Sequence, residues 1–140
     1  MHSLEHQLNI SASPDVVYRA LSTAEGLSGW FTTDVSGSGE VGERWSLGFG
    51  DGLGFVWEVE ASQPDRIVAW ACLEGPGDAP DTTVIFRLQA REDGRTALHF
   101  THRGWPHTSG NFTKCNTLWG GLLHRLKEYA ETGSPRPLYG

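Results

Sequence analysis

The sequence predicts an α+β fold, in which a curved antiparallel sheet of about seven strands wraps around a long C-terminal helix. Three observations lead to this prediction. Apolar and polar residues alternate with a period of two from Thr33 to Arg103, and turn-forming residues interrupt this alternation repeatedly. One alternating segment and two short helical segments precede this region, and one long amphipathic segment follows it. We expect residues 1–140 to form a single domain.

The first elements are a strand and two short helices. Residues 3–11 (SLEHQLNIS) alternate apolar and polar side chains, which predicts a half-buried strand. Ser13 is a suitable N-cap and Pro14 suits the first position of a helix, so a short helix should follow directly. A second short helix is expected around Thr23 to Trp30, with Thr23 as its N-cap.

The sheet continues through a run of alternating segments, separated by stretches rich in glycine, proline and aspartate that favour turns. These segments are residues 43–49, 54–61, 66–73, 83–90 and 96–103. Residues 66–73 (RIVAWACL) are apolar on both faces, which indicates a strand that is covered on both sides or lies at the centre of the sheet. A curved sheet needs glycines or bulges along its strands. We expect these to be supplied by Gly48, Gly50, Gly52 and Gly54.

The last element is expected to be a helix over residues 109–132, because apolar residues recur there at intervals of three and four. Gly133 follows as a usual helix-terminating residue. Gly120 and Gly121, in the middle of this helix, each cost about 1 kcal/mol relative to alanine. We expect them to admit a close neighbour, for which an aromatic side chain of the sheet is sufficient. Because the apolar sheet face is rich in large rings, a cavity between sheet and helix is also expected.

The composition excludes several classes of protein. The chain is 38% hydrophobic and 20% charged, as in ordinary globular proteins. A net charge of −6 argues against a nucleic-acid partner. No apolar run approaches the roughly 20 residues that span a membrane, and no secretory signal is visible, so we expect a cytoplasmic location. Cys72 and Cys115 are far apart and are expected to be reduced, partly buried thiols.

Four motifs, in this order and spacing, resemble a known family. They are ISASPDVVYRALSTAEGLSGWF (10–31), DRIVAWAC (65–72), HFTHRGWP (99–106) and TLWGGLLHRLKEYAETG (117–133). Together they resemble the START-like, SRPBCC superfamily, in the branch related to the C-terminal domain of the activator of Hsp90 ATPase. One departure is that the usual Gly-Trp order in the final helix appears here as Trp119-Gly120.

This resemblance implies a helix-grip fold, also called START-like or Bet v 1-like. In that fold a seven-stranded antiparallel sheet grips the C-terminal helix around an apolar cavity for a small molecule. The superfamily includes lipid and hormone binders, aromatic cyclases and co-chaperone domains, so the fold by itself does not settle the activity. The Hsp90 activator itself carries an additional N-terminal domain, for which 140 residues leave no room. We therefore rank a co-chaperone role behind ligand binding.

The candidate ligand-binding residues are large side chains that are expected to face the cavity. They are Trp30, Phe31, Trp45, Phe55, Trp57, Phe86, Phe100, His102, Trp105, Trp119, Leu122 and Leu123. Each of them could instead be simple core. Tryptophan is large and carries an N–H donor, so six tryptophans favour a partly wet, ring-lined cavity. We expect Trp30 and Phe31 to stand at its entrance.

His102 is the one weak candidate for catalysis. It alternates onto the same face as Phe100, where it could orient a ligand or move a proton, although a hydrogen-bonded core histidine is the commoner situation. No nucleophile motif, Cys-His pair or pair of carboxylates at helical spacing accompanies it, so the sequence leans against an enzyme. His99 and His102 face opposite sides of a strand, so no metal site is predicted.

We therefore predict a small cytosolic protein that binds an apolar or aromatic molecule between the sheet and residues 109–132, without a cofactor. Two alternatives stay open. One is an enzyme of the polyketide cyclase or hydrolase kind that uses His102 as acid or base. The other is a protein-interaction module of the Hsp90 co-chaperone type. An exposed face on Trp70 would support a homodimer.

Overall fold

The computed structural model describes residues 1–50 and 52–139. Its elements along the chain are β1 (His2–Ile10), α1 (Pro14–Ser22), α2 (Ala24–Trp30), β2 (Asp34–Gly37), β3 (Arg44–Gly48), β4 (Gly54–Gln63), β5 (Ile67–Glu74), β6 (Thr83–Ala90), β7 (Thr96–Trp105) and α3 (Asn111–Thr132). The seven strands form one sheet in the order β1-β7-β6-β5-β4-β3-β2, and every neighbouring pair is antiparallel.

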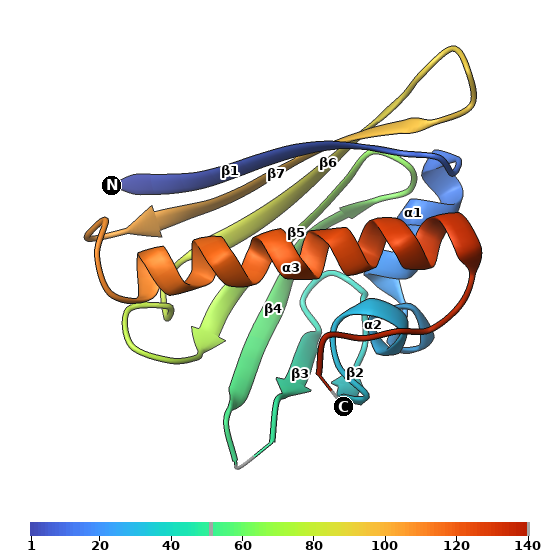
Figure 1. The fold of residues 1–140 in the computed structure, drawn as a ribbon. Helices are drawn as coiled ribbons and strands as arrows, with labels where there is room; N and C mark the ends of the chain where they lie inside the picture. Colours follow the sequence, from blue (N-terminus) through green and yellow to red (C-terminus); the bar gives the residue numbers. More distant parts are fainter. Residues whose placement is uncertain (51, 140) are drawn as a thin grey trace.

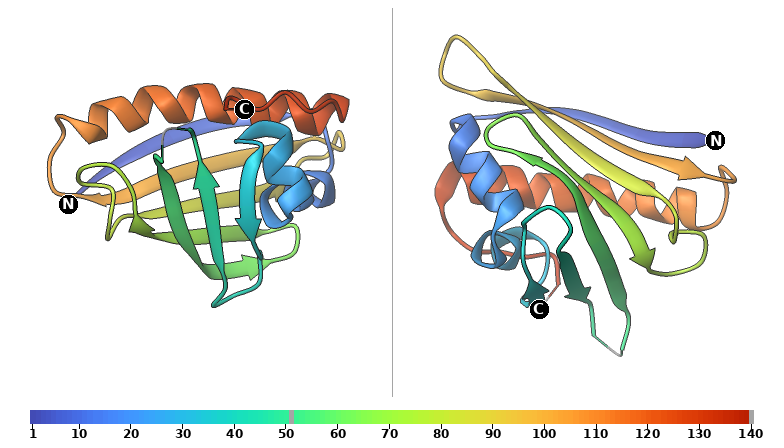
Figure 2. Two further views of the ribbon diagram at one scale, coloured as in Figure 1. Left: turned by 90° about the horizontal axis from the view of Figure 1, so that it is seen from below. Right: turned by 180° about the vertical axis from the view of Figure 1, so that it is seen from behind.

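The sheet is curved, and α3 lies along its concave side (Figure 1). Seen from below, α3 covers one face of the sheet, while α1 and α2 close one end of the curve (Figure 2). The core therefore fills the space between the concave inner face of the sheet and α3. The predicted α+β architecture, with two short helices after the first strand and a long C-terminal helix, is confirmed.

The helix ends follow local sequence signals. The Thr23 hydroxyl accepts a hydrogen bond from the Gly26 N–H at 3.0 Å, which confirms Thr23 as the cap of α2. Ser13 precedes α1 in an extended conformation, but its hydroxyl donates to the Asp15 carboxylate instead of capping a backbone N–H. α3 ends at Gly133, whose φ of 74° is readily adopted by glycine and whose N–H donates to the Tyr129 carbonyl at 2.7 Å.

Of the four glycines that we expected to supply the curvature, two lie in strands and two in a turn. Gly50 and Gly52 have φ of 87° and 73° and lie in the turn between β3 and β4, while Gly48 and Gly54 face each other where that hairpin begins. The register shifts lie further along β4, between Val56 and Trp57 and between Val59 and Ala61. Irregular pairing of this kind increases the local twist and bend of a strand, so β4 supplies sites of curvature, while Gly50 and Gly52 serve the turn.

β5 is the middle strand of the sheet, as its two apolar faces predicted. Trp70 points to the inner face and is 0% exposed. Trp70 therefore offers no exposed face that would support a dimer, because the alternation of β5 sends this ring to the concave side.

The two glycines in the middle of α3 do not admit a ring of the sheet. Among the described residues, no atom lies within 4 Å of the position that a Gly120 Cβ would occupy, and a Gly121 Cβ would meet only Leu138 at 3.8 Å. Both glycines lie away from the sheet, so the close approach that we expected is wrong.

Both cysteines are free and buried, as predicted. Burial raises the pKa of Cys72 to about 12 and that of Cys115 to about 11, so both stay protonated and unreactive at neutral pH. In the part of the chain that the structure describes, no helix combines the length and the apolar character needed to cross a membrane.

Candidate ligand-binding site

The predicted site residues come together in the interior, between the inner face of the sheet and α3. None is more than 2% exposed. They are Trp30, Phe31, Trp45, Phe55, Trp57, Phe86, Phe100, His102, Trp105, Trp119, Leu122 and Leu123. The period-two pattern places the strand residues of this set on one face, with the exception of Trp105. Trp105 is out of phase with Phe100 and His102, and it is buried because the β7 register shifts at Gly104, whose φ is 93°. The intervals of three and four place the α3 residues opposite the strands.

The rings form a continuous network. Phe86 and Phe100 lie directly opposite each other on β6 and β7, with their ring centroids 5.1 Å apart. Trp119 of α3 covers this pair, with its centroid 4.4 Å from Phe100 and 6.0 Å from Phe86. These offset and edge-on arrangements are the ones that aromatic quadrupoles favour. The centre of the molecule is therefore built mainly from aromatic contacts.

Trp30 and Phe31 line the interior and are not at an exposed entrance, since both are 0% exposed. The segment after α3 covers them: the Leu138 N–H donates to the Trp30 carbonyl at 3.2 Å, and the Tyr139 N–H donates to the Phe31 carbonyl at 3.1 Å. This return of the C-terminus depends on tertiary contacts that the local pattern at residues 30–31 does not encode.

His102 lies within a buried chain of hydrogen bonds. The Trp119 Nε1–H donates to His102 Nδ1 at 3.0 Å, so Nδ1 carries no proton. His102 Nε2 therefore carries the ring proton and donates to the Thr82 hydroxyl at 2.7 Å. That hydroxyl donates in turn to the Ala79 carbonyl. The direction of each bond is fixed by the indole, which can only donate.

These hydrogen bonds engage both ring nitrogens of His102. Burial lowers its pKa from 6.5 to about 3, so the ring is neutral at physiological pH. Its Nδ1 lone pair and its Nε2 proton are both engaged, which suits a positioning role for Trp119 better than proton transfer. On the same strand His99 points to the outer face, where its Nε2 lies 3.0 Å from Glu5 Oε1.

The six tryptophans divide into two groups by their N–H groups. Trp30 donates to the Ala20 carbonyl at 2.8 Å, and Trp119 donates to His102. The other four indole N–H groups are buried and have no acceptor among the described residues; they belong to Trp45, Trp57, Trp70 and Trp105. An unpaired buried donor typically costs about 1–3 kcal/mol. The sequence could not show which indoles lack acceptors, because that depends on where the backbone carbonyls lie in the folded chain.

The four unpaired indoles occupy one region of the interior. Trp45 and Trp57 lie opposite each other on β3 and β4, and the Trp57 ring is 6.0 Å from that of Trp70 on β5. Trp105 lies 4.6 Å from the His102 ring, which is itself 5.9 Å from Trp57. These four rings therefore belong to one connected part of the ring network.

A surface hollow of about 470 Å³ lies close to this region, between the β3–β4 turn and the loop after β5. Leu53 and Leu73 line it and are 63% and 38% exposed, a feature that the alternation pattern did not indicate. Phe49, also in the lining, contacts Phe55 at a centroid distance of 5.3 Å, and Phe55 lies 5.0 Å from Trp57. This hollow and three others formed by the described residues open at the surface, and none of these four is lined by a tryptophan.

A family model described as Activator of Hsp90 ATPase homolog 1-like protein matches residues 11–131. Among solved structures, the Aha1 dimer from Colwellia psychrerythraea has a TM-score of 0.86 and 35% sequence identity, over 95% of this chain and 98% of that one. No curated protein is similar enough to this chain to count as a match.

Two further structures share the fold. DynU16, described as a putative protein in the dynemicin biosynthetic locus, has a TM-score of 0.78 and 25% identity, over 95% of this chain and 48% of that one. CalU16 from Micromonospora echinospora has a TM-score of 0.75 and 22% identity, over 96% of this chain and 76% of that one, and shows the fold alone.

Proposed function

This chain belongs to the family of Activator of Hsp90 ATPase homolog 1-like proteins, and from that premise we propose that it binds a small aromatic or apolar molecule between the sheet and α3. The observation that supports this most directly is the set of four buried indole N–H groups without acceptors, at Trp45, Trp57, Trp70 and Trp105. They are donors within a wall of rings, and a ligand with oxygen acceptors would satisfy them.

The chemistry of the ligand follows from the aromatic rings and the four unpaired indole N–H groups of the interior. Ring faces and edges favour another flat aromatic or apolar body. Buried N–H donors favour carbonyl or hydroxyl oxygens on that body, because pairing removes the penalty of an unsatisfied donor. A carboxylate or phosphate is a poorer candidate, since no buried cation accompanies the indoles in the described structure. We propose entry from the hollow at Leu53 and Leu73, past Phe49 and Phe55.

The test uses the indole N–H signals in a ¹⁵N–¹H spectrum, one from each of the six tryptophans. Flavone, a neutral aromatic with a carbonyl acceptor, should shift the signals of the four unpaired indoles. The signals of Trp30 and Trp119 should move little, because their donors already have acceptors. 2-Phenylnaphthalene, of similar shape without oxygen, should bind more weakly. If flavone moves no indole signal at saturating concentration, the interior is closed to ligands and the proposal fails.

Two matched variants locate the effect. Trp57→Phe removes an unpaired N–H, and Trp30→Phe removes an N–H that donates to Ala20. Both changes shorten a buried ring by the same amount. Trp57→Phe should weaken flavone binding by about tenfold, the value of one hydrogen bond, while Trp30→Phe should lower folding stability without that selective loss. Equal losses of affinity would assign the effect to packing alone.

The assembly and location of the chain are part of the same proposal. A homologous structure is described as a dimer, and we propose a homodimer here, to be tested by light scattering after size-exclusion chromatography. A mass of one chain at micromolar concentration would reject it. The free, buried thiols Cys72 and Cys115 suit a reducing compartment, and we propose a cytoplasmic location.

A further inference from the structure

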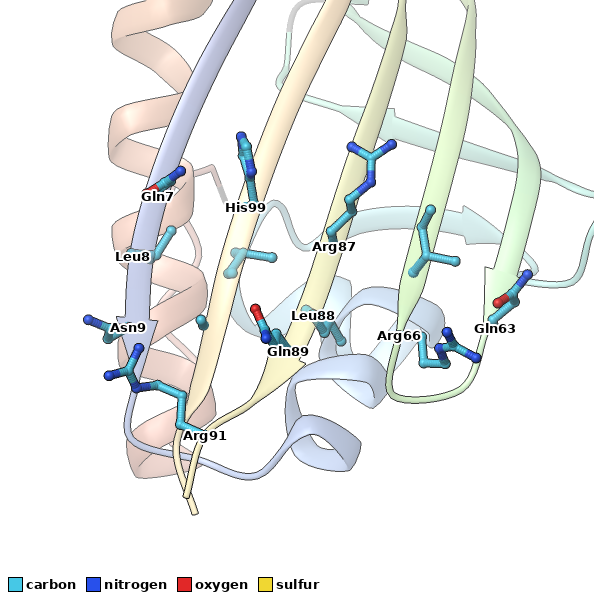
Figure 3. Close-up of a pocket in the computed structure, with 13 residues that line it drawn as sticks. Gln7, Leu8, Asn9, Gln63, Arg66, Arg87, Leu88, Gln89, Arg91 and His99 are labelled. Atoms are coloured by element: carbon cyan, nitrogen blue, oxygen red, sulfur yellow. The ribbon is translucent and has the colours of Figure 1, made fainter. Parts of the chain in front are cut away.

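The outer face of the sheet, opposite α3, carries a groove of about 850 Å³ that none of the described helices covers (Figure 2). It crosses β1, β7, β6 and β5 and reaches the end of β4. In Figure 3 its polar side chains project from one side of the sheet, with α3 behind the strands. The ligand site proposed above lies on the other side, so the two are independent.

The floor of the groove is a row of residues set directly opposite one another on neighbouring strands. In order across the sheet the row is Gln7, His99, Arg87, Ile67 and Gln63. Strands lie about 4.8 Å apart, so this row is roughly 19 Å long. Asn9, Ala97 and Gln89 form a second, shorter row beside it, and the small side chain of Ala97 deepens the groove.

Three arginines with no ion-pair partner line the groove: Arg66, Arg87 and Arg91, called the groove arginines below. None of the ion pairs among the described residues includes any of them. No carboxylate lines the groove within the described part of the chain. Of the acids beside the groove, Glu5 pairs with His99 at 3.0 Å and Asp93 with Arg95 at 2.7 Å. Asp65 and Glu92, next to Arg66 and Arg91 in the sequence, are in none of these ion pairs and do not line the groove. In a chain of net charge −6, the described lining of the groove therefore carries three arginines and no acid.

We propose that this groove binds an extended acidic peptide segment of a partner protein, lying across the strands with its carboxylates at the groove arginines. The guanidinium groups are spread around the groove and do not converge on one point (Figure 3), which fits several carboxylates along a chain. An extended peptide advances about 3.4 Å per residue, so roughly six residues span the row.

The neutral polar side chains of the groove favour a peptide over other polyanions as its ligand. Gln7, Asn9, Gln63 and Gln89 each offer an amide that donates and accepts hydrogen bonds. A peptide backbone has both N–H donors and carbonyl acceptors to match them, whereas a phosphate chain has acceptors only. Among the described residues, no tryptophan, tyrosine or phenylalanine lines the groove, so it lacks the stacking surfaces that single-stranded nucleic acids use.

The test is the anisotropy of a fluorescein-labelled peptide, Gly-Glu-Asp-Glu-Glu-Asp-Gly, titrated with the full chain. Replacing all three groove arginines by glutamine should weaken binding by about tenfold, because three exposed ion pairs of ordinary strength are lost together. The matched control is Arg103→Gln with Lys114→Gln and Arg125→Gln, which removes the same charge outside the groove. It should change the affinity by less than about twofold. Far-ultraviolet circular dichroism checks that both variants are folded.

Three outcomes would overturn the proposal. Equal weakening by the two triple variants would show that only overall charge matters. A peptide with Gln and Asn in place of Glu and Asp that binds equally well would remove the role of carboxylates. An oligonucleotide of six thymidines that binds more tightly than the acidic peptide would assign the groove to a nucleic acid.

Discussion

The two faces of the sheet share the same strands but use them differently. On β7, Phe100 and His102 point inward and are 0% exposed, while His99 and Thr101 point outward. The inner residues contact α3, and the outer residues contact only neighbouring strands and solvent. Along one strand, the inward residues thus pack the core, and the outward residues form a surface that is accessible to partners.

The two histidines of β7 show the difference most directly. His102 is neutral and has both ring nitrogens in buried hydrogen bonds, one with Trp119 and one with Thr82. His99 shares one contact with Glu5 at the surface. The same side chain is a fixed part of the core on one face and an accessible polar group on the other. Comparing a substitution on the inner face with a matched substitution on the outer face therefore tests whether the stability of the fold depends on the inner face alone.

The largest expected effect comes from the ring network. Phe100→Ala removes a ring that packs against Phe86 and Trp119, and it should lower the free energy of unfolding by about 3–5 kcal/mol. Thr101→Ala, one residue away on the outer face, should change it by less than about 0.5 kcal/mol. Urea unfolding followed by circular dichroism measures both. Comparable losses in the two variants would mean that the outer face also carries the fold.

A smaller effect is expected from the buried hydrogen-bond chain. Thr82→Val keeps the shape of the side chain but leaves the His102 Nε2–H and the Ala79 carbonyl without the hydroxyl that pairs them. The free energy of unfolding should fall by about 1–3 kcal/mol. Thr101→Val makes the same change on the outer face and should stay within about 0.5 kcal/mol of the parent. If Thr82→Val is as stable as Thr101→Val, the chain of hydrogen bonds contributes nothing measurable to folding.

The sequence predicted the inner face better than the outer one, for a physical reason. Burial imposes a period of two, so the alternation alone assigns Phe100 and His102 of β7 and Trp57 of β4 to the inner face. Alternation did not predict the hydrogen-bond partner of His102. Thr82 lies just before the neighbouring strand β6, and only the pairing of β6 with β7 brings its hydroxyl to His102.

The outer groove had no signal of this kind in the sequence. Arg66, Arg87 and Arg91 look like ordinary solvated charges, since outward positions tolerate any polar residue. Only the antiparallel register brings Arg87 next to His99 and the turn at Arg66 next to β6. Both the unpaired indoles and the groove therefore depend on tertiary geometry, which a single sequence does not display.

The pH dependence of stability tests the burial of His102. Burial holds the pKa of His102 at about 3 in the native state, against 6.5 for an ordinary histidine. Between these values the unfolded ring binds a proton and the native ring does not, so stability is fully present above pH 6.5 and falls as the pH drops. The expected loss is about 1.4 kcal/mol per pH unit.

The measurement is urea unfolding between about pH 6.5 and about pH 5, above most carboxylate titration. His102→Gln cannot take up this proton, so the stability difference between the parent and this variant should shrink as the pH falls. Thr101→Ala, on the outer face, changes no titratable group and should keep the slope of the parent. A constant difference between parent and His102→Gln would show that the buried ring is already protonated in the native state or is not buried in solution.

The smallest expected effect comes from adding a methyl group on the outward side of α3, compared with adding one where α2 packs against α3. Gly120→Ala should raise the free energy of unfolding by about 1 kcal/mol, because alanine is the better helix former. Its Cβ would meet no described atom within 4 Å. Gly29→Ala in α2 is the opposite case, since its Cβ would collide with the Tyr129 ring of α3, and it should destabilise the protein. If Gly120→Ala instead loses stability in dilute monomer, the outward side of α3 contacts part of the chain itself. If Gly120→Ala loses stability only at concentrations where the proposed dimer forms, the outward side of α3 belongs to the dimer interface. In that case a second chain approaches the space beside Gly120, which this chain leaves open.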